Sequence, residues 1–234
     1  MSFAARRESI SLPPLEVMVH NEIPLASGLG SSAAAIVAGV KLASLITGRD
    51  ISDQTIQNYA TEFEGHPDNV TASLYGGFVA SCVRNDGTVV TTKFNWPAHI
   101  RIVVVSPRSQ LPTHVARAAL PRTISREDAV HNLQRTALFT SALAQQRYDL
   151  LWEAMRDRLH QPHRESLVPG LAEALALPQM KGLLGIALSG AGPSIVGLVD
   201  SNEEEIGDRV SSCFRAHRIE STVRILEADN DGVT

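Results

Sequence analysis

The 234-residue chain contains only two cysteines, Cys82 and Cys213, and they lie far apart. They provide neither a metal-binding spacing nor a disulfide framework, so we expect a reducing compartment, the cytoplasm. No apolar run is long enough to cross a membrane, and residues 1–11 lack the apolar core of a secretory signal. The net charge of -4 gives no electrostatic reason to expect nucleic acid or an anionic membrane as a partner.

The composition suits a globular protein with a sizeable core. Hydrophobic residues make up 44% of the chain and charged residues 20%, at a length that allows one or two domains. The residue patterns in the first part of the chain predict a strand at 15–19, a helix at 32–47 that ends at Gly48, a helix at 52–64 that is capped by Ser52 or Asp53, a turn at 66–69, and a hairpin with strands at 76–83 and 88–94.

A boundary is indicated at Asn95-Trp96-Pro97. After it, the patterns predict a strand at 100–105, helices at 113–120, 125–145 and 148–160, strands at 182–189 and 195–199, a helix at 202–216 and a strand at 221–227. This order is typical of an antiparallel sheet with helices on one face. We therefore expect an α+β fold.

A glycine loop runs from Pro24 to Ser32 and leads directly into an alanine-rich helix. A helix start leaves N–H groups without partners inside the helix and is the positive end of the helix dipole. Because Gly28 and Gly30 have no Cβ atom, the backbone of the loop can lie directly against a ligand. These features predict an anion cradle, most often one for phosphate.

Two other interpretations of the glycine loop are disfavoured. A P-loop needs a lysine after its last glycine, and none follows Gly30. The spacing Gly28-x-Gly30-x-x-Ala33 satisfies a dinucleotide fingerprint, whose acidic residue would be Asp50. That acidic residue must end a second parallel strand, whereas Asp50 lies in a polar turn directly after a predicted helix.

Several blocks of sequence extend the argument to most of the chain. They are Pro24-Leu25-x-x-Gly28-Leu29-Gly30-Ser31-Ser32-Ala33-Ala34, Glu64-Gly65-His66-Pro67-Asp68-Asn69-Val70, Asp157-Arg158-Leu159-His160-Gln161-Pro162-His163-Arg164 and Leu188-Ser189-Gly190-Ala191-Gly192-Pro193-Ser194. In this order they resemble the GHMP kinases. The second and third blocks are similar to the homoserine kinases in particular, and segments at 113–121 and 128–132 also fit that family.

The resemblance implies a two-domain GHMP kinase fold. Its parts would be a ribosomal protein S5 domain 2-like domain over 1–97 and a ferredoxin-like domain over 98–234. The family's N-terminal motif, P-A-[ST]-x-N-[LI]-G-x-G-[FY]-D, has no counterpart in this sequence, so we expect a truncated first domain. Missing strands would expose backbone edges and apolar surface. A truncated pseudokinase without activity is therefore one alternative to an active enzyme.

The same resemblance implies an activity. The reaction would transfer the γ-phosphoryl group of ATP to the side-chain hydroxyl of L-homoserine, with Mg²⁺ as cofactor, in threonine biosynthesis. Another GHMP-type kinase, such as a mevalonate-type enzyme, is the second alternative. A homodimer is a possible assembly.

The expected nucleotide-binding residues follow from the matching blocks. The resemblance implies that the ATP phosphates bind Pro24, Gly28, Leu29, Gly30, Ser31, Ser32 and Ala33, with Gly190 and Gly192 closing the site. Mg²⁺ is expected at Ser32 and Glu64, since magnesium needs only one or two protein oxygens besides those of phosphate. Glu62 is an open alternative, and only one of the two carboxylates should face the loop because residues two apart on a helix point to different sides.

The expected homoserine-binding residues are His66, Asn69 and Arg164. A guanidinium fork such as that of Arg164 matches a carboxylate through two parallel hydrogen bonds. The resemblance favours Asn69 as a contact to the homoserine hydroxyl and Asp68 as an orienting group or a base. Asn69, Asp68 and Arg164 are thus the catalytic candidates, although phosphoryl transfer does not require a dedicated base, because positioning and charge neutralisation do most of the work.

Overall fold

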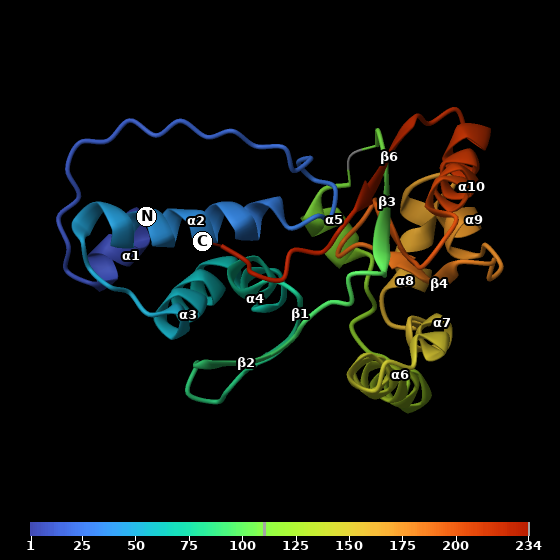
Figure 1. Ribbon diagram of the computed structural model, residues 1–234, viewed down its shortest axis with the longest axis horizontal. Coiled ribbons are helices and arrows are strands. Elements are labelled where there is room, and N and C mark those ends of the chain that lie inside the picture. The colour runs from blue at the N-terminus through green and yellow to red at the C-terminus, as the bar shows by residue number, and fades with distance from the viewer. Residues whose placement is uncertain (110, 234) are drawn as a thin grey trace. The chain divides into compact units, whose positions relative to one another are not determined.

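The computed structural model describes residues 1–109 and 111–233. Its contacts divide the chain into two compact units, whose elements are drawn in Figure 1. Unit 1 contains residues 1–24, residues 30–96 and the segment from Asp229 onward, and unit 2 contains residues 25–29 and 97–228. The glycine loop is therefore divided after Pro24 and again after Leu29. Because these units are defined by contacts alone, the predicted domains 1–97 and 98–234 stay predictions.

Unit 1 is built around one long helix. Its helices are α1 (Ser2–Arg7), α2 (Ser31–Thr47), α3 (Asp53–Glu64) and α4 (Asp68–Tyr75). Both α3 and α4 pack against α2. The α2 residues that enter the core recur every three or four positions, as expected for one face of a helix, and they are Ala33, Val37, Val40 and Ala43.

The ends of α2 and α3 follow from the local sequence. Gly48 takes the left-handed conformation at the C-cap of α2, with φ of 64°. Ser52 Oγ accepts a hydrogen bond from Thr55 N at 3.3 Å at the start of α3. Both helices are confirmed, and Ser52 rather than Asp53 is the cap.

A two-stranded antiparallel hairpin follows α4. Its strands are β1 (Phe78–Val83) and β2 (Val89–Phe94), and Val83 lies opposite Val89 next to the turn. In the turn, Asp86 Oδ1 accepts a hydrogen bond from Thr88 N at 2.9 Å. The buried amide of Gln57 on α3 donates to Val89 O at 3.0 Å and joins the hairpin to the helices. The predicted hairpin is confirmed.

Two predictions for unit 1 are wrong. Residues 15–19 form no strand: no described strand pairs with them, and Met18 is 96% exposed. A strand needs a partner for its backbone groups, and none of the described strands provides one to residues 15–19. The turn predicted at 66–69 is shorter than expected, because Asp68 begins α4. The helix dipole stabilises a carboxylate in the first turn of a helix, which explains why Asp68 begins α4 and does not extend the turn.

Unit 2 contains a four-stranded antiparallel sheet in the order β4-β5-β3-β6. Its strands are β3 (Arg101–Pro107), β4 (Leu183–Leu188), β5 (Ile195–Val199) and β6 (Ser221–Leu226). Helix α10 (Glu203–Ala216) packs against β3 and β6 and buries Ile206, Val210 and Phe214 in the core. The strand order is that of a ferredoxin-like domain, and the α+β prediction is confirmed.

One long helix, α6, and several short ones connect β3 to β4. They are α5 (Thr113–Ala118), α6 (Arg126–Ala144), η1 (Tyr148–Leu150), α7 (Leu151–Ala154), α8 (Gln161–Arg164), η2 (Glu165–Leu167) and α9 (Leu171–Leu175). The single helix predicted at 148–160 is wrong, since α7 ends at Ala154. The Asp157 carboxylate accepts backbone N–H groups of residues 159–161, which offers the chain an alternative to a helix. Within residues 1–109 and 111–233, no helix has the length and apolar character needed to cross a membrane.

Candidate active site

The glycine loop meets unit 1 at the start of α2. Gly30 is the N-cap residue with φ of 73°, and Ala34 N donates to Gly30 O at 3.0 Å as the first hydrogen bond of the helix. The N–H groups of Ser31, Ser32 and Ala33 precede that bond, so the helix itself gives them no acceptor. With the positive end of the helix dipole they can hold an anion, which is the role predicted for them.

Ser32 lies beside the last residue of α3. Its hydroxyl donates to Glu64 Oε2 at 2.9 Å, whereas Glu62 forms an ion pair with Arg7 of α1. A hydroxyl and one carboxylate are oxygen ligands of the kind that Mg²⁺ takes from a protein when phosphate supplies the rest, so this donor pair fits the ion. In the part of the chain that the structure describes, no cluster of three or more His, Cys, Asp or Glu side chains could hold a metal.

The turn before α4 brings a second set of predicted residues to the same unit. His66 Nδ1 contacts Asp68 Oδ1, and the Asp68 side chain is 72% exposed. Asn69 lies against the glycine loop: a Cβ atom built on Gly30 would be 3.6 Å from Asn69 Oδ1. Asn69 is thus adjacent to the N-cap of α2.

In unit 2, Gly28 lies directly against the turn that joins β4 to β5. Ser189 Oγ donates to Gly28 O at 2.8 Å, and Ser194 N donates to Ser27 O at 3.3 Å. A Cβ atom on Gly28 would lie 2.1 Å from Ser189 O and 2.9 Å from Gly192 N, and φ of Gly28 is 77°. Only glycine fits at position 28, because a Cβ atom there would collide with the backbone of the β4–β5 turn. The absence of a side chain at Gly28 therefore allows the two glycine segments to pack against each other.

The β4–β5 turn is itself fixed by buried hydroxyls. The Ser194 side chain is fully buried, and its Oγ lies 2.8 Å from Ser106 Oγ on β3. A Cβ atom on Gly190 would lie 3.1 Å from Gly28 O, so the turn stays close to the loop along its length. Ser189 was not among the predicted site residues. Its place directly before Gly190-x-Gly192 was the signal that could have identified it.

Arg164 closes α8 and reaches the same turn. It is only 7% exposed; its Nε donates to Ala116 O at 3.2 Å and its Nη1 to Gly190 O at 3.0 Å. Burial lowers the pKa of Arg164, a nearby Asp157 raises it and Arg117 lowers it. An arginine stays charged at neutral pH under such shifts. The positively charged guanidinium of Arg164 is therefore bound to Gly190, the residue of the β4–β5 turn that lies against Gly28.

The structure separates the predicted residues into two sets. Unit 1 holds Pro24, Gly30, Ser31, Ser32, Ala33, Glu64, His66, Asp68 and Asn69, and unit 2 holds Gly28, Leu29, Arg164, Gly190 and Gly192. Within unit 1, Ser32 meets Glu64 and Asn69 meets Gly30. Within unit 2, Gly190 meets both Gly28 and Arg164. The chemical roles of these residues stay predictions.

Two polar residues that were not predicted for the site contact each other at the segment before α8. Asp157 lies before α8, and Asn132 on α6 donates to Asp157 Oδ1 at 2.7 Å. Both occur in segments that carry the family resemblance, but other polar and charged residues surround them there, so the sequence does not single them out. Their contact joins two distant segments, and no sequence spacing predicts it.

Both halves of the chain match one class of enzyme. The profile of the GHMP kinases N terminal domain matches residues 2–77, and the profile of the GHMP kinases C terminal domain matches residues 139–216. The fold and the phosphate-type loop thus define a GHMP kinase.

Individual relatives narrow the family. The homoserine kinase of Aquifex aeolicus is 42% identical over 221 residues, which cover 94% of this chain and 74% of the relative. The crystal structure of homoserine kinase from Cytophaga hutchinsonii superimposes with a TM-score of 0.81 at 31% identity, covering 91% of this chain and 69% of that one. The crystal structure of L. major mevalonate kinase, at 18% identity and a TM-score of 0.62 over 100% of this chain and 76% of that one, shows a shared fold alone. The chain belongs to the homoserine kinase family.

Proposed function

We propose that the chain transfers the γ-phosphoryl group of ATP to the side-chain hydroxyl of L-homoserine, giving ADP and O-phospho-L-homoserine for threonine biosynthesis. The observation that carries the proposal is the arrangement around Gly190. This residue accepts a hydrogen bond from Arg164 and lies against Gly28 of the glycine loop. Within unit 2, a group suited to a carboxylate is thereby held beside the Gly28 segment of the glycine loop.

The phosphate groups of ATP would bind the N–H groups at the start of α2. These are the N–H groups of Ser31, Ser32 and Ala33, and Gly28 and Gly30 let the backbone approach a ligand without a side chain in between. Their position is set before the substrate arrives, since α2 is anchored in the core of unit 1. Such fixed donors stabilise charge on the transferring group without reorganisation during the reaction.

Ser32 and Glu64 would hold Mg²⁺. When bound, the ion neutralises charge that develops on the phosphate oxygens. In the structure the Ser32 hydroxyl donates to the Glu64 carboxylate, so both oxygens already lie together. Glu62 is occupied by Arg7, which supports Glu64 as the carboxylate ligand.

Arg164 would bind the carboxylate of homoserine. A guanidinium has five N–H donors, and two of them go to Ala116 O and Gly190 O. The remaining donors on Nη1 and Nη2 form the fork that suits a carboxylate. Arg117 adds a second positive charge nearby, close enough to lower the pKa of Arg164.

The homoserine hydroxyl would be oriented by Asn69, with His66 as a further substrate contact and Asp68 as the orienting group or base. His66 contacts Asp68, so one carboxylate oxygen is engaged and the other is available to a hydroxyl proton. Phosphoryl transfer proceeds through a loose transition state in which positioning outweighs proton abstraction. We expect the reaction to run in the cytoplasm, and a homodimer is one candidate assembly.

The test is ATP turnover by the purified chain with a panel of hydroxyl acceptors. L-homoserine is expected to release ADP and to yield a phosphate monoester by mass spectrometry, whereas mevalonate and galactose are expected to yield none. Turnover of mevalonate instead of homoserine would overturn the proposal in favour of another GHMP kinase. Absence of turnover with every acceptor would favour a pseudokinase.

A further inference from the structure

The carboxylate of Asp157 accepts four hydrogen bonds, although it lies on no helix or strand. Its Oδ2 accepts from Gln161 N at 2.6 Å and His160 N at 2.8 Å, and its Oδ1 accepts from Leu159 N at 3.1 Å and Asn132 Nδ2 at 2.7 Å. Three of these donors are the backbone N–H groups that lead into α8. Because three of these hydrogen bonds come from consecutive backbone N–H groups, this half-buried carboxylate fixes the path of the chain.

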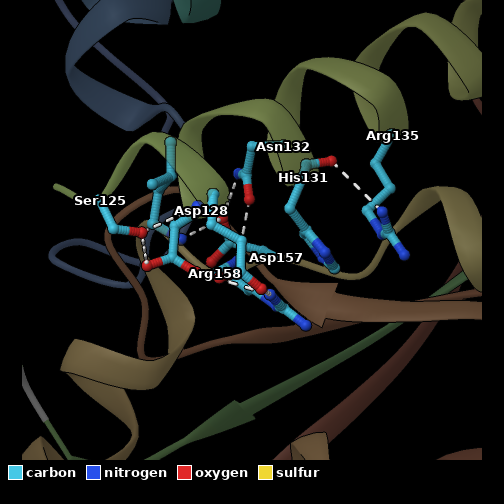
Figure 2. Close-up of polar contacts among 9 residues, drawn as sticks. Ser125, Asp128, His131, Asn132, Arg135, Asp157 and Arg158 are labelled. Carbon is cyan, nitrogen blue, oxygen red and sulfur yellow. Dashed lines mark hydrogen bonds and ion pairs between the residues drawn. The ribbon is translucent and has the colours of Figure 1, made fainter.

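Asn132 fixes the same segment from α6. Figure 2 shows its side chain between α6 and the loop that contains Asp157 and Arg158. Its Nδ2 donates to Asp157, and its Oδ1 accepts from Arg158 N at 2.9 Å. One amide group therefore holds both the carboxylate and the neighbouring backbone. Through Asn132, the segment that leads into α8 is anchored to α6, which is 19 residues long.

Helix α8 passes this constraint on to Arg164. It is only four residues long, from Gln161 to Arg164, and so short a helix does not hold its shape unaided. Gln161 is tied at its N–H group to Asp157 and at its Oε1 to Leu188 N, which donates at 2.7 Å. Arg164 follows one turn later, and its guanidinium reaches Ala116 O and Gly190 O.

The negative charge of Asp157 supports Arg164 in addition to the hydrogen bonds that fix the start of α8. Burial alone raises the pKa of Asp157, but the hydrogen bonds from Gln161 N, Asn132, His160 N and Leu159 N outweigh burial and hold the pKa below its ordinary value. The group is thus an anion at neutral pH. Its charge raises the pKa of Arg164, which favours the cationic form that a carboxylate ligand requires.

We infer that Asp157 and Asn132 are positioning residues for the amino-acid substrate: they set the place of the Arg164 guanidinium by fixing the start of α8. The inference rests on the proposed function, since it takes the substrate carboxylate to bind Arg164. Neither residue touches the substrate itself. Their contribution is expected in the affinity for homoserine and not in the affinity for ATP.

Steady-state kinetics of four variants tests the inference. We expect Asp157→Ala and Asn132→Ala to raise the KM for homoserine about tenfold, with kcat and the KM for ATP changed less than about twofold. Asp157→Ser should recover part of the loss, because a serine oxygen also accepts N–H groups at a helix start. Asp149→Ala is the matched control: this carboxylate of the same unit pairs with Arg147 at an exposed turn and should leave every constant unchanged.

A double-mutant cycle separates positioning from general damage. In an Arg164→Ala background, Asp157→Ala should add no further increase in the KM for homoserine, because the group on which it acts is gone. Multiplication of the two single effects would overturn the inference. If the unmodified chain phosphorylates homoserine and Asp157→Ala has the same KM for homoserine, the inference is also overturned. If the unmodified chain phosphorylates only other acceptors, the proposed function is overturned, and the substrate role of Asp157 with it.

Hydrogen exchange gives a readout that needs no turnover. In Asp157→Ala, amides of residues 158–165 should exchange faster than in the wild type, while those of α10 keep their protection. Unchanged exchange at 158–165 would show that Asp157 does not hold α8, and the inference would then be wrong whatever the kinetics.

Discussion

The two units hold their candidate residues in opposite ways. In unit 1, Ser32 and Asp68 are exposed, and their contacts are with other side chains, namely Glu64 and His66. In unit 2, Arg164 and Ser194 are buried, and Arg164 is held by backbone carbonyl groups. Side-chain contacts at a surface can rearrange around a nucleotide and a metal ion, whereas a buried guanidinium held by backbone keeps one position. On the proposed function, the group for the substrate carboxylate, Arg164, lies in unit 2, and the candidate metal ligands Ser32 and Glu64 lie in unit 1.

The contact between Gly28 and the β4–β5 turn should be the most sensitive point of this arrangement. Gly28→Ala places a Cβ atom 2.1 Å from Ser189 O in a left-handed conformation, so the free energy of unfolding should fall by about 3 kcal/mol or more. Gly48→Ala is the control. Gly48 has φ of 64° and open space around it, so its substitution should cost only about 1 kcal/mol. Urea denaturation measures both, and equal losses would contradict the importance of the contact.

Arg164→Ala tests whether the buried guanidinium recognises substrate. The KM for homoserine should rise about 30-fold, which corresponds to about 2 kcal/mol for a lost charged hydrogen bond, and the KM for ATP should stay as it is. Arg147→Ala removes an exposed arginine of the same unit and should change neither constant. An unchanged KM for homoserine in Arg164→Ala would remove this residue from the site.

Glu64→Gln tests the exposed set in unit 1. It should lower kcat on the order of tenfold, because a metal ligand becomes neutral, and excess Mg²⁺ should restore part of the loss. Glu62→Gln keeps the same chemistry two residues away on the same helix and should leave kcat unchanged. Equal kcat values in the two variants would make the assignment of Glu64 to the metal wrong.

The smallest expected effect is the acid sensitivity of the segment before α8. The pKa of Asp157 is depressed in the folded chain, so its stabilisation is complete above the unfolded-state pKa of about 3.9 and is lost as the pH falls through the folded value. Asp157→Asn should therefore lower the free energy of unfolding at pH 7 and flatten its decline below about pH 4. Urea titrations at several pH values measure this slope, and parallel curves for the two proteins would contradict it.

The sequence predicted the regular parts of both units. The small-residue helix after the loop, the hairpin around Asp86 and the β4–β5 pair all have strong local signals, and the structure contains them. The strand at 15–19 was wrong because a strand depends on a partner elsewhere in the chain, whereas the helix at 148–160 was wrong because the Asp157 side chain makes local hydrogen bonds to the backbone. Residues 15–19 lack a pairing strand among the described residues, and Asp157 ends the helical path through its own carboxylate.

The candidate site shows the same division. Glycine and hydroxyl spacing predicted the loop, and Glu64 was predicted as the metal ligand with Glu62 left as an open alternative. The contacts of Ser189 with Gly28 and of Asn132 with Asp157 join residues 161 and 25 positions apart. No periodicity connects such pairs, so they emerged only from the fold.

One measurement tests the central claim most directly: the ratio of kcat/KM for homoserine to that for 3-aminopropan-1-ol, the same acceptor without its carboxylate. The wild-type chain should prefer homoserine by about 100-fold or more, because the analogue has no carboxylate to pair with the buried guanidinium of Arg164. Arg164→Ala should reduce the ratio to less than about tenfold, since neither acceptor then has a partner for this position. A ratio that is the same in both proteins would contradict the account.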